Sequence, residues 1–235
     1  NNEGSITSSV QVNSTAGFSI IRFTGTNSAA TVGHGLSVAP EWVISKNLDD
    51  TANWAVYHKD LTSYAKTLFL SDNRAETSST TMWDSKVTTE TVINVSSNFA
   101  TNGSSDRMVM YAWHSVVGFS KFGKYFGNSD SDGTFVYTGF KPAWLMVKKL
   151  SGSGNWVIMD STRSPINPVA TFFNADGDSE VTTAARQTDL LSNGFKFRGD
   201  NPATNASGTY VYFAFAEHPF IGSQTLKGFS PVTAR

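Results

Sequence analysis

The sequence contains no cysteine, and this absence excludes several kinds of chemistry at once. Disulfide bridges, thiolate zinc sites and thiol nucleophiles all require a cysteine sulfur. Charge is also scarce, because only 16% of the 235 residues are charged and the formal net charge is −1. A nucleic-acid partner needs a basic face, and membrane insertion needs a run of about 18 apolar residues. The chain offers neither pattern, so we expect no nucleic-acid partner and no membrane insertion.

Helical periodicity is missing as well, because helix-forming residues do not recur at 3.6-residue spacing for more than a turn or two. Instead, Val, Ile, Thr and aromatic residues form short runs that are separated by Gly, Asn, Asp and Ser. Short strands at regular spacing indicate an all-β fold, either a β-sandwich or a barrel, and we expect a β-sandwich of jelly-roll or lectin-like type. One short helix is expected near Val181–Leu191. Strands are expected near residues 18–24, 42–47, 54–58, 67–70, 91–95, 107–114, 121–126, 134–139, 144–149, 156–160, 170–173, 195–198 and 209–216.

Two parts of the chain repeat each other at a distance of 102 residues, since 142 − 40 = 102. Pro40–Lys46 corresponds to Pro142–Lys148, and Met108–Trp113 corresponds to Tyr210–Phe215. We interpret this pattern as a tandem duplication of a unit of roughly 100 residues. The expected organisation is a linker or exchanged strand at 1–16, β repeats at 17–117 and 118–221, and a C-terminal tail at 222–235.

The strands Met108–Trp113 and Tyr210–Phe215 are apolar on both faces. A strand of this kind is central and covered on both sides. One face is expected to pack on the core of its own repeat. The other face needs a second sheet, the sister repeat or another subunit, and we favour a contact between the repeats or between subunits.

The aromatic residues, 13% of the chain, suggest a surface on which sugar rings stack. The tryptophans that recur in both repeats, Trp42 with Trp144 and Trp54 with Trp156, are interpreted as core residues that both copies need for folding. Trp83 has no counterpart and lies in a polar stretch, so it is expected to be exposed and to contact a ligand.

Residues for catalysis or metal binding form no convincing set. His34 stands between two glycines, and we interpret it as a turn histidine whose ring bonds to the backbone, with a base or a metal ligand as the alternative. No G-x-S-x-G nucleophile turn occurs, and no glutamate of one repeat recurs in the other. We therefore expect no enzyme activity, no cofactor and no metal.

One acidic turn is the best further candidate for a contact with a ligand. Asn128, Asp130 and Asp132 precede Gly133 and provide oxygen atoms at alternate positions, as in the first half of an EF-hand loop. The twelfth position is Gly139, so the glutamate that completes such a loop is missing. An exposed hairpin turn is the simpler interpretation, and a shallow calcium or receptor contact is the alternative. We expect Trp83, Asn128, Asp130 and Asp132 to form the ligand-binding residues.

Several motifs together resemble a module common in tail-fibre and other tail-structural proteins of marine bacteriophages. The resemblance covers residues 17 to about 220 and has no catalytic residues to transfer. The motifs are Gly33-His34-Gly35-Leu36, Val43–Lys46, Phe119–Tyr125, Pro142–Lys148, Gly154-Asn155-Trp156, Leu191–Lys196 and Ala214–Phe220.

This resemblance implies a homotrimeric module of the virion tail that contacts a host cell-surface glycan or protein. The expected function is therefore non-enzymatic adhesion, with other virion tail proteins as further partners. A purely structural virion component, such as a decoration or tail-collar protein, is the alternative. A polysaccharide-degrading enzyme is the less favoured third hypothesis.

Overall fold

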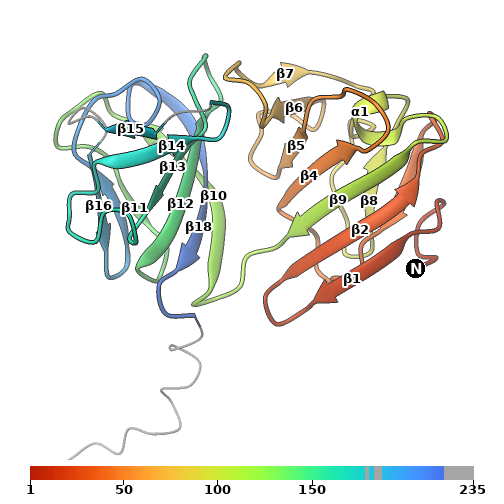
Figure 1. Cartoon of the computed structure of the whole chain (residues 1–235), viewed down its shortest axis with the longest axis horizontal. Helices are drawn as coiled ribbons and strands as arrows, with labels where there is room; N and C mark the ends of the chain where they lie inside the picture. The colour runs from red at the N-terminus through yellow and green to blue at the C-terminus, as the bar shows by residue number, and fades with distance from the viewer. Residues whose placement is uncertain (178–179, 183–186, 220–235) are drawn as a thin grey trace, which may run out of the picture.

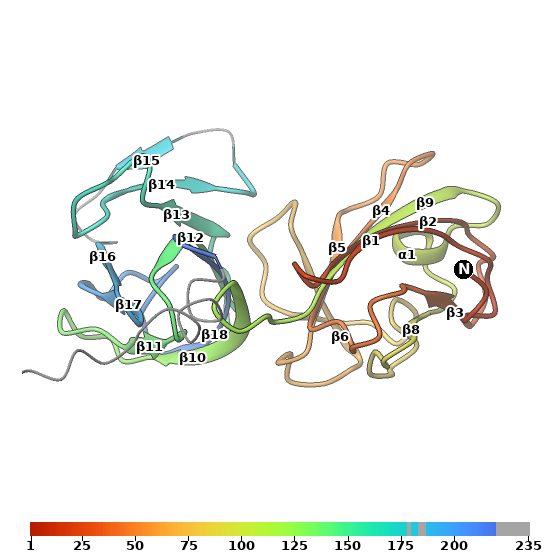
Figure 2. The same ribbon diagram turned by 90° about the horizontal axis from the view of Figure 1, so that it is seen from below.

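The computed structural model shows a nearly all-β protein with two halves of similar build (Figure 1). The structure describes residues 1–177, 180–182 and 187–219, and it describes 180–182 by their backbone alone. The expected C-terminal tail at 222–235 lies outside the described residues. We refer to residues 1–113 as the first half and to residues 120–219 as the second half. In Figure 2 the connection between them runs from the end of β9 to the start of β10.

A seven-stranded antiparallel sheet forms most of the first half. A two-stranded sheet, β3 (Ala30–Gly33) with β8 (Val92–Val95), and the short helix α1 (Phe99–Asn102) complete this half. The large sheet has the order β1 (Ser9–Asn13), β2 (Phe18–Thr24), β9 (Arg107–Trp113), β4 (Trp42–Asn47), β5 (Ala55–His58), β6 (Lys66–Phe69) and β7 (Thr77–Ser78).

The second half combines a six-stranded antiparallel sheet with a three-stranded one. The large sheet has the order β10 (Ser120–Gly127), β18 (Gly208–Ala216), β12 (Pro142–Lys149), β13 (Val157–Asp160), β14 (Thr171–Asn174) and β15 (Glu180–Thr182). The small sheet has the order β11 (Phe135–Tyr137), β17 (Gly194–Phe197) and β16 (Thr188–Leu191).

Each half has an apolar core on the inner face of its large sheet. Alternate residues of a strand point to opposite faces, so Ile21 and Met110 enter the first core while their neighbours face outward. Tyr210 and Tyr212 enter the second core in the same way. A half of roughly 100 residues is large enough to bury such a core, and each half is sandwich-like.

The two large sheets have the same strand order when the edge strand β1 is set aside. If the six strands of each sheet are numbered by their order along the chain, their order across the sheet is first, sixth, second, third, fourth and fifth. The register agrees too, because Trp42 lies opposite Trp113, and Trp144 lies opposite Phe215. Both partners are shifted by 102 positions between the halves.

The expected strands are found, with ends that differ by one or two residues. Residues 1–16 are not a linker, because β1 pairs with β2 of the same chain along the edge of the sheet. The short helix expected near Val181–Leu191 is not found in the described part of this segment, since residues 181–182 belong to β15 and residues 188–191 to β16; residues 183–186 lie outside the described residues. The helix α1 was not expected; the side chain of Asn98 caps it by accepting a hydrogen bond from the Ala100 amide.

Candidate functional site

The outer faces of the two large sheets meet in a third apolar cluster between the halves. The ring of Phe213 on β18 lies 4.3 Å from the ring of Trp42 on β4, measured between centroids. Phe122 on β10 lies 5.6 Å from the same tryptophan. The second apolar face of β18 is therefore covered by the first half, as the sequence pattern had led us to favour.

Two long side chains of the second half add polar bonds to this junction. The indole Nε1 of Trp156 donates to the backbone oxygen of Phe69 at 2.8 Å, and Trp156 is fully buried. The Nζ of Lys148 donates to the backbone oxygens of Asn73 at 3.3 Å and Arg74 at 2.7 Å. Burial lowers the pKa of Lys148 to about 8, because the charged form loses its hydration.

A buried histidine also lies at the junction. The ring of His58 makes an edge contact with Phe213 at 5.1 Å, and its Nδ1 accepts a hydrogen bond from the Asp60 amide at 3.1 Å. Burial lowers the pKa of His58 to about 3. The ring is therefore neutral at physiological pH and acts as an uncharged packing group.

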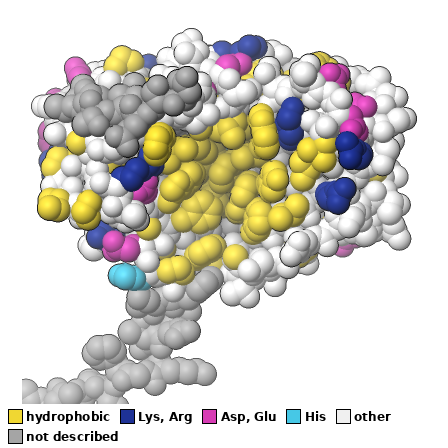
Figure 3. All heavy atoms as spheres, viewed as in Figure 1, with side chains coloured by type: hydrophobic (Ala, Val, Ile, Leu, Met, Phe, Trp, Pro, Cys, Tyr) yellow, Lys and Arg dark blue, Asp and Glu magenta, His cyan; other side chains and the backbone are white. Residues whose placement is uncertain are grey.

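Beyond the junction, the outer faces of the sheets stay partly open to solvent. Five half-buried aromatic side chains line this region, and we call them the aromatic surface: Phe18, Tyr111, Trp113, Trp144 and Phe215. Figure 3 shows apolar side chains as one continuous area across the middle of the molecule, between the two halves. The area thus includes strands that belong to both halves.

The rings of the aromatic surface are linked by direct contacts. Phe18 stacks on Trp113 at 4.8 Å, and Trp113 stacks on the buried Trp42 at 4.2 Å. On the second half, the ring of Trp144 lies 5.7 Å from that of Phe215. A ring fixed by its neighbours has little conformational freedom left to lose if another molecule covers its open face.

This surface was not predicted as a site from the sequence. The strands of Trp113 and Phe215 were expected to be covered on both faces, and Trp144 was expected to be a core residue. The available signal was the apolar second face of these strands. That signal cannot distinguish a face covered by the sister half from one that is left half open, and the protein has both.

The expectation that Trp83 is exposed is wrong. Its side chain is only 1% exposed and packs in the first core, with its ring edge-on to Tyr57. Its indole Nε1 donates to Thr67 Oγ1 at 3.2 Å. The neighbours of Trp83 in the sequence are polar, but its burial depends on strands that are distant in the sequence. Trp83 therefore has no exposed surface that could contact a ligand.

The tryptophans shared by the two halves divide into different environments. Trp42 and Trp156 are buried as expected, whereas Trp144 is half-buried. Trp54 is 37% exposed, so its interpretation as a core residue is wrong. Trp54 and Trp156 hold the same place in their halves, but Trp156 is fully buried and bonded to Phe69 of the first half, whereas Trp54 lines an open pocket beside Ala175 of the second half. The docking of the halves is thus the physical reason for this difference.

The turn with Asn128, Asp130 and Asp132 is exposed, and its oxygen atoms are used within the turn. Asn128 Oδ1 accepts from the Asp130 amide at 3.1 Å, and Asp130 Oδ1 accepts from the Asp132 amide at 2.8 Å. Asp132 pairs with Lys196 at 3.0 Å, and this pairing lowers the pKa of Asp132. A receptor contact by this turn remains a prediction. In the described part of the chain, no three His, Cys, Asp or Glu side chains lie close enough to hold a metal ion together.

His34 has the structural role expected of a turn histidine. It is fully buried, its Nδ1 accepts from the Leu36 amide at 3.2 Å, and its Nε2 lies 3.1 Å from the backbone oxygen of Thr89. Because Nδ1 accepts, Nε2 carries the proton and donates it to Thr89. Burial lowers the pKa of His34 and favours this neutral form.

These features define an all-β fold in which two sandwich-like halves dock by the outer faces of their large sheets. The chain belongs to the family described as a domain of unknown function (DUF7483), whose model matches residues 1–219. The match spans both halves, so the family unit includes the junction and the aromatic surface. No curated protein and no solved structure matches the chain. Among the described residues, no helix is long and apolar enough to span a membrane.

Proposed function

We propose that this protein is a non-enzymatic adhesion module of a bacteriophage tail fibre, which binds a host cell-surface glycan through the aromatic surface. One observation carries the proposal: rings from both halves are held half-open on one continuous apolar face. Trp and Tyr rings present an apolar body together with a polar group, which suits the apolar face and hydroxyl edge of a sugar ring. The assignment to a phage tail, and to a homotrimer within it, rests on the motifs shared with tail-structural proteins.

We also propose that the two halves arose by tandem duplication. The shared strand order and the register shifted by 102 positions support this origin. Duplication places an aromatic pair in each half, Trp113 beside Phe18 and Trp144 beside Phe215. A lectin-like module built twice would then present two adjacent stacking sites to one extended glycan.

A glycan array tests the adhesion function directly. The full-length protein is applied to immobilised bacterial lipopolysaccharides and capsular polysaccharides, and bound protein is measured. We expect binding that Trp113→Ala and Trp144→Ala each weaken about tenfold, as loss of one stacking ring costs roughly 1–2 kcal/mol. Circular dichroism confirms that each variant is folded.

Phe99→Ala provides the matched control. Phe99 is 52% exposed but lies on α1, which packs on the opposite face of β4, so this change removes an exposed ring away from the aromatic surface. Absence of binding to every glycan, or equal losses for Phe99→Ala and Trp113→Ala, would contradict the proposal. Release of soluble oligosaccharide would instead support the enzyme hypothesis.

A structural role in the virion is the second candidate, because half-exposed aromatic residues and few charges are also typical of protein interfaces. In that case another virion protein or a second copy of the chain covers the aromatic surface. Light scattering distinguishes the two roles: Trp113→Ala changes the oligomeric state if the surface is an interface between copies. Adhesion predicts an unchanged oligomer with reduced glycan binding.

A further inference from the structure

The open face of the first half changes from aromatic to basic along its strands. The register places Phe18, Trp113 and Trp42 in one row across β2, β9 and β4. The row two residues further on contains Ile20, Tyr111 and Ile44. The next row contains Arg22, Val109 and Lys46. Figure 3 accordingly shows Lys and Arg side chains at the edge of the apolar area on the first-half side.

The three cations near this edge differ in how their charges are used. Arg107 is occupied, because its Nε donates to the carboxylate oxygens of Asp49 at 2.9 and 3.2 Å. Lys46 donates from Nζ to the backbone oxygen of Ala52 at 2.7 Å. The side chain of Arg22 is exposed and makes no hydrogen bond or ion pair with any described residue. Its five N–H donors are therefore available to a ligand.

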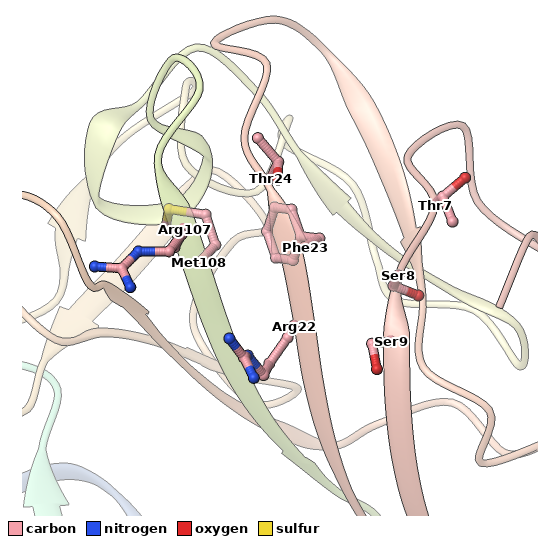
Figure 4. Close-up of a pocket in the computed structure, with 8 residues that line it drawn as sticks. All are labelled: Thr7, Ser8, Ser9, Arg22, Phe23, Thr24, Arg107 and Met108. Atoms are coloured by element: carbon pink, nitrogen blue, oxygen red, sulfur yellow. The ribbon is translucent and has the colours of Figure 1, made fainter.

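A pocket lies directly beside Arg22. It has a volume of about 350 Å³ and opens where β1 begins to diverge from β2 (Figure 4). Ser9 lies opposite Arg22 in the strand register and adds a hydroxyl group, while Arg107 lines the pocket from β9 with its guanidinium group turned away from Ser9. The pocket thus combines the free guanidinium group of Arg22 with the hydroxyl group of Ser9.

We propose that the ligand of the aromatic surface is an acidic polysaccharide, with a carboxylate of the sugar chain bound by Arg22. This inference rests on the proposed function and specifies its ligand class. A guanidinium group forms paired, charge-assisted hydrogen bonds with a carboxylate, which gives both affinity and orientation. Arg22 follows Phe18 by four positions on β2, or about 13 Å, so the ligand is longer than one sugar unit. The acidic polymer is favoured because Lys46 and Arg107 are bonded within the protein, whereas the guanidinium group of Arg22 has no partner among the described residues.

The test compares polygalacturonate with the uncharged polymer dextran. Both are immobilised, and binding of the full-length protein is measured by biolayer interferometry at low salt. We expect the wild-type protein to bind polygalacturonate, and Arg22→Gln to weaken that binding about tenfold, the effect of one lost charge-assisted bond. Trp113→Ala should weaken it as well, because the same chain covers the rings.

Lys86→Gln is the matched control, since it removes one positive charge from an exposed side chain on the loop before β8. It should change the affinity less than about twofold, because separated surface charges are screened. Failure to bind polygalacturonate, or equal affinities of Arg22→Gln and the wild-type protein, would overturn the inference. Binding to dextran that is lost in Trp113→Ala but kept in Arg22→Gln would overturn the acidic ligand alone. Binding to an acidic peptide and to neither polymer would overturn the proposed function too.

Discussion

Replacement of Trp156 by alanine tests whether the junction between the halves stabilises the fold. Removal of a buried Trp side chain costs about 3–5 kcal/mol, from lost apolar burial and the cavity left behind. The change also removes the 2.8 Å hydrogen bond to the backbone oxygen of Phe69, which keeps the Asp72 amide as a second donor, so this loss adds about 0.5–1.5 kcal/mol. We therefore expect Trp156→Ala to lower the free energy of unfolding by about 3.5–6.5 kcal/mol, against a typical total of about 5–15 kcal/mol.

Trp54→Ala is the internal control, because Trp54 occupies the corresponding place in the first half and is 37% exposed. Urea unfolding followed by far-ultraviolet circular dichroism measures both variants. Trp54→Ala should cost about 1 kcal/mol, as expected for a partly exposed side chain away from the core. Trp156→Phe should be intermediate, since it keeps the ring but loses the donor. If Trp156→Ala and Trp54→Ala differ by less than about 1 kcal/mol, the docking of the halves described above is refuted.

Three further predictions concern buried polar groups. The pKa of His58 is lowered to about 3 from an ordinary 6.5, so only the unfolded chain binds this proton as the pH falls below 6.5. The free energy of unfolding of the wild-type protein should therefore fall by about 1.4 kcal/mol per pH unit below pH 6.5, beyond any fall seen in His58→Asn. Urea unfolding of both proteins at pH 7 and pH 5 measures this difference. The pKa of Lys148 is lowered to about 8 from 10.5, so the folded chain loses this proton at a lower pH than the unfolded chain does. Between pH 8 and 9.5 the free energy of unfolding should therefore rise with pH in the wild-type protein and not in Lys148→Met, as urea unfolding can measure. Trp83→Phe should lower the thermal midpoint because it removes the hydrogen bond to Thr67, while glycan binding stays unchanged; reduced binding at full stability would show that Trp83 contacts the ligand after all.

The strands could be predicted because each carries its own local signal. Runs such as residues 42–47 combine β-branched or aromatic residues with turn residues at their ends, and local chemistry then determines local structure. The edge strand β1 was expected only as an exchanged strand, the alternative to a linker, because Ser9–Asn13 is mostly polar. Its pairing depends on the edge that β2 offers, and that edge is not visible in the sequence of residues 1–16.

The candidate site was harder to predict from the sequence, because the exposure of a side chain depends on how segments distant in the sequence pack together. Trp54 and Trp156 have equivalent sequence surroundings, yet only the docking of the halves decides that Trp156 is buried. Trp83 shows the same limit in reverse, since its partner Thr67 lies 16 residues away. Sequence periodicity identified the apolar second face of residues 108–113 and 210–215. It could not show which part of that face, such as Trp113, remains open.

The most direct test of the account is a footprint of the glycan on the tryptophans. The indole N–H signals of the protein labelled with nitrogen-15 are assigned by single substitutions, and a glycan identified on the array is then added. The account predicts that the signals of Trp113 and Trp144 shift, while those of the buried Trp83 and Trp156 stay in place. Unchanged signals for Trp113 and Trp144 with bound glycan would show that the aromatic surface is not the binding site.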